Sequence, residues 1–343
     1  METLYRKYRP EKFSEVVGQD HIVSVLVASI KKGNISHAYL FSGPRGIGKT
    51  SVARIFSREI GTHENDLYEM DAASQSGVDD IRALTEGVNT LPFQSKYKVY
   101  ILDEAHMLSK AAWNALLKTL EEPPKHAIFV LATTELEKVP ETVISRCQGF
   151  SFKKPSEQVL KEVISGAVKK EGKKLSNDAV ELIALLGDGS YRDAYGILQK
   201  VITVSSGKEI SAEDVEKVTG APKHQTVNEV LLAISKGDSA KALEATSSAS
   251  KAGTEIKTFL KLLIYKMRAV LLLRFDTKSS AYLSERFSKE DIETLTEIAK
   301  DKSSKINAQA LLEILNSYSS VGRFVVPELP LELALMKILE ANS

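Results

Sequence analysis

The sequence contains a single cysteine, Cys147, in 343 residues. One thiol excludes an internal disulfide and any cysteine-rich metal site. A charge excess is also lacking: 46 Lys and Arg balance 45 Asp and Glu, so any nucleic-acid contact must come from a local patch or from several subunits together. The most apolar stretch, 259–275, is interrupted by Lys and Arg, and the N-terminus has no apolar signal core. We therefore expect a cytoplasmic protein that does not bind a membrane.

The clearest motif is a glycine-rich G-x-x-x-x-G-K-[ST] loop between an apolar run suited to a buried strand, 37–42, and a helical stretch, 50–60. Its glycines allow a tight turn that aims several N–H groups at one point, beside the positive end of the helix dipole. Lys49 can then reach the β- and γ-phosphates of a nucleotide, and the Thr50 hydroxyl suits the accompanying Mg²⁺. A structural glycine turn is the less favoured alternative. The predicted binding residues are Gly43, Pro44, Arg45, Gly46, Ile47, Gly48, Lys49, Thr50 and Ser51.

An acidic pair, Asp103-Glu104, follows a second apolar strand, 98–102. Parallel strands of an open α/β sheet present ligands at their carboxyl ends, so this pair is placed to serve a Mg²⁺-nucleotide site. Asp103 would hold the Mg²⁺ through its water shell, and Glu104 would polarise the attacking water. Acidic residues at strand ends are also common as solvated turn starts. The intact glycine-rich loop upstream favours the catalytic interpretation.

Strands alternate with helices through residues 1–153, which predicts a parallel sheet covered on both faces. Residues 154–219 have the pattern of a small helical lid, and residues 220–343 are helical throughout. Near a glycine turn in the lid, Arg192 could point back at the phosphates or be an ordinary surface arginine. The broad apolar stripe in 259–272 suits either a bundle core or a subunit interface.

Several further motifs follow one another in a fixed order. They are Tyr8-Arg9-Pro10, Val17-Gly18-Gln19, the glycine-rich loop, Asp71-Ala72-Ala73-Ser74, Gly77-Val78-Asp79, Asp103-Glu104-Ala105-His106-Met107-Leu108, Leu120-Glu121-Glu122-Pro123-Pro124 and Ser145-Arg146-Cys147. With this series the chain resembles the gamma/tau subunits of bacterial DNA polymerase III, the clamp-loader ATPases of the AAA+ class. The resemblance covers nearly the whole chain. It implies an α/β AAA+ P-loop domain with a parallel sheet (1–153), a helical lid (154–219) and an all-helical collar, or oligomerisation, domain (220–343).

The resemblance also implies residue roles. Thr134 would be the sensor 1 residue and Arg192 the sensor 2 arginine, whereas Arg146 would be an arginine finger acting on ATP held by a neighbouring subunit. The residues expected to border the adenine are Tyr8, Arg9, Pro10 and Val17. The implied activity is hydrolysis of ATP, with Mg²⁺, to load a sliding clamp onto primer-template DNA. The implied partners are other clamp-loader subunits in a hetero-oligomeric ring, the clamp and the DNA backbone.

One departure concerns zinc. In that family a four-cysteine zinc module usually lies between the helix after the phosphate loop and the next strand, whereas Gly61–Asp66 is a short connection without cysteine. We therefore expect no zinc site, because His63, Glu64 and Asp66 have no further ligand nearby. We also expect none of the polymerase- and helicase-binding domains of a long tau form within these residues.

Two alternatives remain at this point. One is another AAA+ DNA remodeller, such as a branch-migration motor, which would form a homohexamer. The other is a scaffold that binds nucleotide without turnover, against which the intact catalytic set argues. For a clamp loader, duplex binding by shape requires contacts to the DNA backbone. Our candidate contacts are Lys98, Lys110, Lys118 and Lys138.

Overall fold

The computed structural model describes residues 2–205, 207–275, 283, 287 and 289–340. The chain divides into two compact units. The first comprises residues 1–160 and 187–196, and the second comprises residues 161–186 and 197–343. The proposed boundaries at 153/154 and 219/220 remain predictions.

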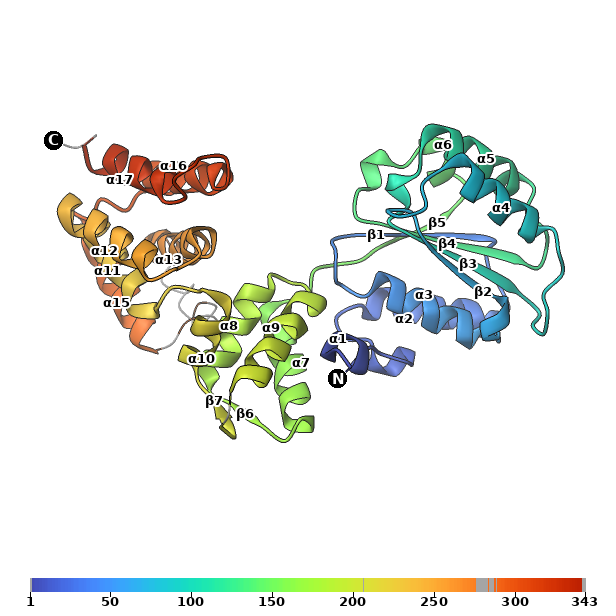
Figure 1. The fold of residues 1–343 in the computed structure, drawn as a ribbon, viewed down its shortest axis with the longest axis horizontal. Helices are drawn as coiled ribbons and strands as arrows, with labels where there is room; N and C mark the ends of the chain where they lie inside the picture. Colours follow the sequence, from blue (N-terminus) through green and yellow to red (C-terminus); the bar gives the residue numbers. More distant parts are fainter. Residues whose placement is uncertain (1, 206, 276–282, 284–286, 288, 341–343) are drawn as a thin grey trace. The chain divides into compact units, whose positions relative to one another are not determined.

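The first unit contains a five-stranded sheet in the order β2-β3-β4-β1-β5, in which every neighbouring pair is parallel (Figure 1). Every residue of β1 and β4 is buried, which explains their unbroken apolar runs. In register, Ser42 pairs with Thr133 and Ser151, so the carboxyl ends of three strands meet at one edge. The strands are β1 (Ala38–Ser42), β2 (Leu67–Asp71), β3 (Lys98–Asp103), β4 (Ala127–Thr133) and β5 (Gln148–Ser151).

Helices cover both faces of this sheet, as the alternating sequence pattern predicts (Figure 1). On one face, buried Trp113 and Leu116 pack with Tyr100 and Phe129 of the sheet. On the other face, the ring of Phe56 lies 4.7 Å from that of Tyr39. The helical elements are α1 (Leu4–Lys7), η1 (Phe13–Glu15), α2 (Asp20–Lys32), α3 (Lys49–Glu59), η2 (Glu64–Asp66), α4 (Val78–Val88), η3 (Ala105–Met107), α5 (Lys110–Glu121), η4 (Leu136–Lys138) and α6 (Glu141–Ile144).

Local signals fix several of these boundaries. The Ser109 hydroxyl accepts a hydrogen bond from the backbone N–H of Ala112 and caps α5, as expected. The same helix ends at Glu121, directly before Pro123-Pro124, where the ring geometry stops helical bonding. In the second unit, Ser211 and Asp214 form both halves of a capping box.

The described residues of the second unit are mostly helical, and two short strands, β6 (Lys174–Leu175) and β7 (Glu209–Ile210), pair in parallel. The apolar stripe of α13 is bundle core where Phe259, Leu263 and Met267 are fully buried. No helix in the described residues is long and apolar enough to cross a membrane. The remaining helices of the chain are α7 (Glu157–Lys170), α8 (Asn177–Gly187), α9 (Tyr191–Val204), α10 (Ala212–Thr219), α11 (His224–Lys236), α12 (Ser239–Lys251), α13 (Ile256–Phe275), α15 (Lys289–Lys300), α16 (Ala308–Ser320) and α17 (Leu329–Glu340). The starts of α7 and α9 and the last residue of α8 belong to the first unit.

Candidate nucleotide-binding site

The glycine-rich loop between β1 and α3 has a backbone that only glycine tolerates. Gly43, Gly46 and Gly48 have φ angles of 142°, 75° and 102°. A Cβ on Gly43 would lie 2.6 Å from the Phe152 carbonyl oxygen, and a Cβ on Gly46 would lie 2.1 Å from Ser190 Oγ. The loop therefore closes against the end of β5 and the residue before α9, and both contacts leave no room for a side chain.

Lys49 is the first residue of α3 and is only 5% exposed. Its ammonium group donates hydrogen bonds to the carbonyl oxygens of Gly43 (2.7 Å) and Pro44 (2.8 Å). Burial lowers the pKa of Lys49, and the carboxylate of Glu104 partly offsets this effect. A buried cation beside a glycine-rich loop, at the N-terminus of a helix, fits a polyphosphate.

The side chains of Thr50 and Asp103 are in contact at the carboxyl edge of the sheet. The Thr50 hydroxyl donates a 2.7 Å hydrogen bond to Asp103 Oδ2. A hydroxyl and a carboxylate oxygen are the hard ligands that Mg²⁺ prefers, and such sites are completed by water and substrate phosphates. The residues present therefore fit a Mg²⁺ ion delivered with a nucleotide.

Glu104 follows Asp103 in an unusual backbone conformation. Its φ of 48° and ψ of 43° lie in the left-handed region, which costs a non-glycine residue about 1–2 kcal/mol. The turn sends its carboxylate toward β4, where the Thr134 hydroxyl donates a 3.0 Å hydrogen bond to Glu104 Oε2. The structure thus brings the predicted water-polarising carboxylate and the predicted sensor hydroxyl together. Backbone strain of this kind concentrates at functional sites.

The N-terminal arm joins the same site. Arg9 Nε donates a 2.9 Å hydrogen bond to Ser51 Oγ on α3, and burial lowers the pKa of Arg9. The Tyr8 ring stacks on Tyr195 of α9 with 5.8 Å between ring centroids. The backbone carbonyl of Val17 accepts a 2.8 Å hydrogen bond from the hydroxyl of Tyr191. Contacts with α3 and the first turns of α9 thus hold Tyr8, Arg9 and Val17, and Pro10 is half-buried. A contact of these four residues with a base remains a proposal.

The start of α9 also carries Arg192. Its Cβ would lie 3.3 Å from a Cβ built on Gly46, and its guanidinium lies 5.9 Å from the centroid of the Tyr5 ring. The backbone N–H of Tyr191 donates a 2.9 Å hydrogen bond to the carbonyl of Gly46. This places the backbone of Arg192 beside the loop, and a guanidinium that faces the phosphates stays a prediction.

Arg146 lies elsewhere, after α6. Its guanidinium pairs with Glu121 Oε1 at 2.6 Å and donates to the Thr142 carbonyl oxygen at 2.6 Å. These partners lie outside the glycine-rich loop, and a role of Arg146 on the ATP of another subunit stays a prediction. Burial raises the pKa of the adjacent Cys147 thiol to about 11.

One candidate DNA contact is wrong. Lys98 is 5% exposed, and its ammonium group donates to the Gly87 carbonyl and to Thr90 Oγ1, each at 2.8 Å. It caps the last turn of α4 instead of facing solvent. Lys110 and Lys118 are exposed and remain candidates, as does Lys138, which pairs with Glu135.

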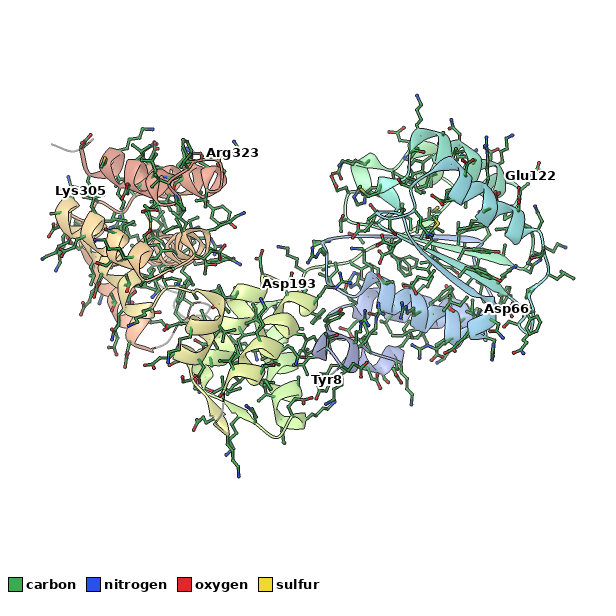
Figure 2. The ribbon with its side chains drawn as sticks, in the orientation of Figure 1. Tyr8, Asp66, Glu122, Asp193, Lys305 and Arg323 are labelled. Atoms are coloured by element: carbon green, nitrogen blue, oxygen red, sulfur yellow. The ribbon has the colours of Figure 1, made fainter. Side chains whose placement is uncertain are left out.

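The short connection Gly61–Asp66 is held by a carboxylate. Asp66, directly before β2, is labelled in Figure 2. It is fully buried and accepts hydrogen bonds from the backbone N–H groups of Phe93, Gln94 and Ser95. Burial alone would raise the pKa of Asp66, but these bonds lower it to about 2. Among the described residues no cluster of three or more His, Cys, Asp and Glu side chains could hold a metal ion. The hydrogen bonds of Asp66 therefore anchor the loop at residues 93–95 to the connection before β2.

Comparisons with known proteins place the chain in a family. A family profile described as "DNA polymerase III, delta subunit" matches residues 18–77 and 62–156, and one described as "DNA polymerase III subunits gamma and tau domain III" matches residues 210–343. The DNA polymerase III subunit gamma of Buchnera aphidicola is 33% identical, over 91% of this chain and 90% of the relative. The chain belongs to the DNA polymerase III gamma/tau family.

Other gamma/tau relatives are longer. The subunit tau of Bacillus subtilis is 36% identical over 99% of this chain but only 64% of its own length. For the gamma/tau subunit of Mycoplasma pneumoniae, which is 38% identical, the shares are 75% and 41%. The chain thus spans less than two thirds of these two relatives.

A solved structure supports the AAA+ fold. The Holliday junction branch migration motor RuvB of Thermotoga maritima has a TM-score of 0.54 to this chain, with 24% identity over 66% of this chain and 79% of RuvB. At this identity the likeness concerns the fold alone. The gamma/tau chain thus combines an AAA+ P-loop domain with helical segments in its carboxyl-terminal half.

Proposed function

We propose that this gamma/tau chain is an ATPase subunit of a clamp loader, which binds ATP with Mg²⁺ and hydrolyses it to load a sliding clamp onto primer-template DNA in the cytoplasm. The single observation that carries the ATPase part is the 2.7 Å hydrogen bond between Thr50 and Asp103. It joins the phosphate loop to the strand end that bears Glu104. The clamp-loading part rests on membership of the gamma/tau family.

In this proposal each residue of the site has its own role. The backbone amides of the glycine-rich loop and Lys49 bind and orient the polyphosphate, and Thr50 and Asp103 hold the metal. Mg²⁺, when bound, neutralises charge on the β- and γ-phosphate oxygens. Glu104 orients the attacking water and accepts its proton, while Thr134 fixes the direction of the Glu104 carboxylate.

Two arginines act on charge that develops during hydrolysis. Arg192, beside Gly46, acts within its own chain, whereas Arg146 acts on ATP in a neighbouring subunit. A guanidinium supplied in trans stabilises the transition state only when the neighbour is in place. Assembly of a hetero-oligomeric ring thereby becomes a condition for fast hydrolysis.

The test is the ATPase activity of the complex reconstituted with its clamp-loader partners, the sliding clamp and primed DNA. We expect clamp and primed DNA to stimulate hydrolysis. We expect Glu104→Gln to lower the rate by about 10²-fold or more, and the exposed Glu64→Gln to leave it unchanged. Absence of stimulation by clamp and DNA would remove the clamp-loading assignment.

The same experiment addresses the two alternatives. Equal rates for the wild type, Glu104→Gln and Arg146→Ala would favour the scaffold without turnover. A homohexamer that moves branched DNA, measured by sedimentation and by a strand-exchange assay, would favour the branch-migration motor. The RuvB likeness alone does not favour the motor, because it is a likeness of fold.

A further inference from the structure

A buried histidine lies beside the proposed water-polarising carboxylate and has no role in the function described so far. His106 is in η3, directly after β3, and its side chain is 6% exposed. Its Nδ1 atom lies 3.2 Å from Thr133 Oγ1 and 3.5 Å from Glu104 Oε2. Its Nε2 atom lies 3.2 Å from Glu135 Oε1. The ring therefore bridges the ends of β3 and β4.

Hydrogen-bond partners hold the ring at both nitrogens. Thr133 Oγ1 accepts the backbone N–H of Glu135 at 3.0 Å and keeps its own O–H and a second lone pair for the contact with His106 Nδ1. The Glu135 carboxylate can only accept, so the Nε2–H group donates to it. Each ring nitrogen has a partner, and both partners come from the residues at the end of β4.

Glu135 is itself fixed from the solvent side. Lys138 Nζ lies 2.8 Å from Glu135 Oε2, and its hydrogen bond lowers the pKa of Glu135. Glu135 thus remains a charged acceptor for His106 at neutral pH. A chain of polar contacts runs from Lys138 through Glu135 and His106 to Glu104.

The position of the Glu104 carboxylate depends on the groups that surround it. Its backbone is in the left-handed region, and its Oε2 atom receives the Thr134 hydroxyl at 3.0 Å with the edge of the imidazole at 3.5 Å. A ring locked at both nitrogens limits the rotamers that this carboxylate can adopt. Small misplacements of a catalytic group cost large factors in rate.

We propose that His106, braced by Glu135, is a positioning residue that holds the Glu104 carboxylate in its water-orienting direction. This inference rests on the proposed role of Glu104 in hydrolysis. It distinguishes His106 from a histidine that only fills space in the core, because it assigns His106 an effect on the chemical step and none on nucleotide binding.

The test compares variants in the reconstituted complex with clamp and primed DNA, measuring kcat, KM for ATP and ATP binding. His106→Phe keeps the ring shape and removes both nitrogens, so kcat should fall about 10- to 100-fold, the usual cost of losing an orienting partner, with KM within about twofold. His106→Asn places an amide near the Nδ1 position and should recover part of kcat. Glu135→Gln should lower kcat less than His106→Phe, and the double variant should be no worse than His106→Phe alone.

His126 provides the matched control. Its Nε2 atom lies 2.9 Å from the Val88 carbonyl, and it precedes β4, at the opposite end of that strand. His126→Phe should leave kcat unchanged if its fold, followed by circular dichroism, is intact. A wild-type kcat in folded His106→Phe and His106→Asn would overturn the inference, as would a parallel rise in KM that accounts for the whole loss. If Glu104→Gln itself retained full activity, the failure would lie in the proposed function.

Discussion

The guanidinium of Arg146 lies 2.6 Å from the carboxylate of Glu121, so the arginine proposed to act on a neighbour's ATP is paired within its own chain. Both side chains are partly exposed, at 33% and 50%, and such pairs contribute only about 0–1 kcal/mol. A triphosphate carries more charge than one carboxylate. In the proposed role, exchanging Glu121 for a neighbour's phosphates would therefore cost little free energy.

Arg146→Ala should separate hydrolysis from binding. In the reconstituted complex we expect a loss of about 10³-fold or more in the ATPase rate, the usual effect of an arginine finger. ATP affinity of the isolated chain, measured by titration calorimetry, should not change. Arg82→Ala, which removes an exposed arginine paired with Asp79, is the control and should have no effect on either quantity. An equal loss of binding in the isolated chain would show that Arg146 acts in its own subunit.

Gly46→Ala should abolish ATP binding, because its Cβ would lie 2.1 Å from Ser190 Oγ and displace the start of α9. Gly33→Ala is the matched control. Gly33 has a φ of 70°, close to the 75° of Gly46, but nothing lies within 4 Å of its added Cβ. It should lose only the roughly 1–2 kcal/mol of left-handed strain and keep its ATP affinity. Titration calorimetry and urea unfolding distinguish the two effects, and equal behaviour of the variants would contradict the steric argument.

Asp66→Asn should loosen the loop at 93–95, because an amide cannot accept three N–H bonds as a carboxylate does. We expect a loss of about 2–3 kcal/mol in the free energy of unfolding and faster amide hydrogen exchange at these residues. The exposed Asp71→Asn, which removes a carboxylate bonded to the N–H of Ala73, should cost less.

The Asp66 contribution should also depend on pH. The folded-state pKa of about 2 lies below the ordinary value of 3.8, so the contribution is complete above about pH 4 and is lost as the pH falls toward 2. The stability difference between wild type and Asp66→Asn should shrink over that window. A difference that stayed constant down to pH 2 would contradict this assignment.

Lys266→Met should destabilise the second unit. Lys266 is 3% exposed, and its ammonium group lies 2.6 Å from buried Asp291 and 2.7 Å from Asn228 Oδ1. Removing the cation leaves Asp291 without this charged partner in the core, which costs about 3–5 kcal/mol. Lys337→Met is the control, since the side chain of Lys337 is 68% exposed in its pair with Glu313 and should contribute less than about 1 kcal/mol. Urea unfolding measures both, and similar losses would refute the distinction.

Much of the first unit could be predicted because its signals are local. A few neighbouring residues are enough to specify the glycine-rich loop, the apolar strand before Asp103 and the Ser109 cap. Their predicted places in the chain are confirmed. That the carboxyl ends of β1 and β3 serve one site follows from the geometry of parallel sheets. The sequence and this geometry were therefore enough to expect Thr50 and Asp103 at the same site.

What the sequence could not supply depends on contacts between distant segments. The pairing of Glu121 with Arg146 and the anchoring of the 93–95 loop by Asp66 have no local pattern. Lys98 was misplaced because a lysine at a strand start looks solvent-exposed, whereas the end of α4 supplies buried acceptors for it. His106 could have been noticed from its place directly after the acidic pair, but its partner Glu135 lies on the next strand's loop.

Cys147 makes the chain well suited to site-directed probes. Only the thiolate reacts with alkylating reagents, and a thiol whose pKa is raised to about 11 by burial is almost wholly protonated at neutral pH. It is the only cysteine in the sequence. A cysteine introduced at an exposed position such as Lys110 would therefore carry a fluorophore or crosslinker almost alone, with the native residue beside Arg146 left in place. Movements of this chain could then be followed without first altering the segment around Arg146.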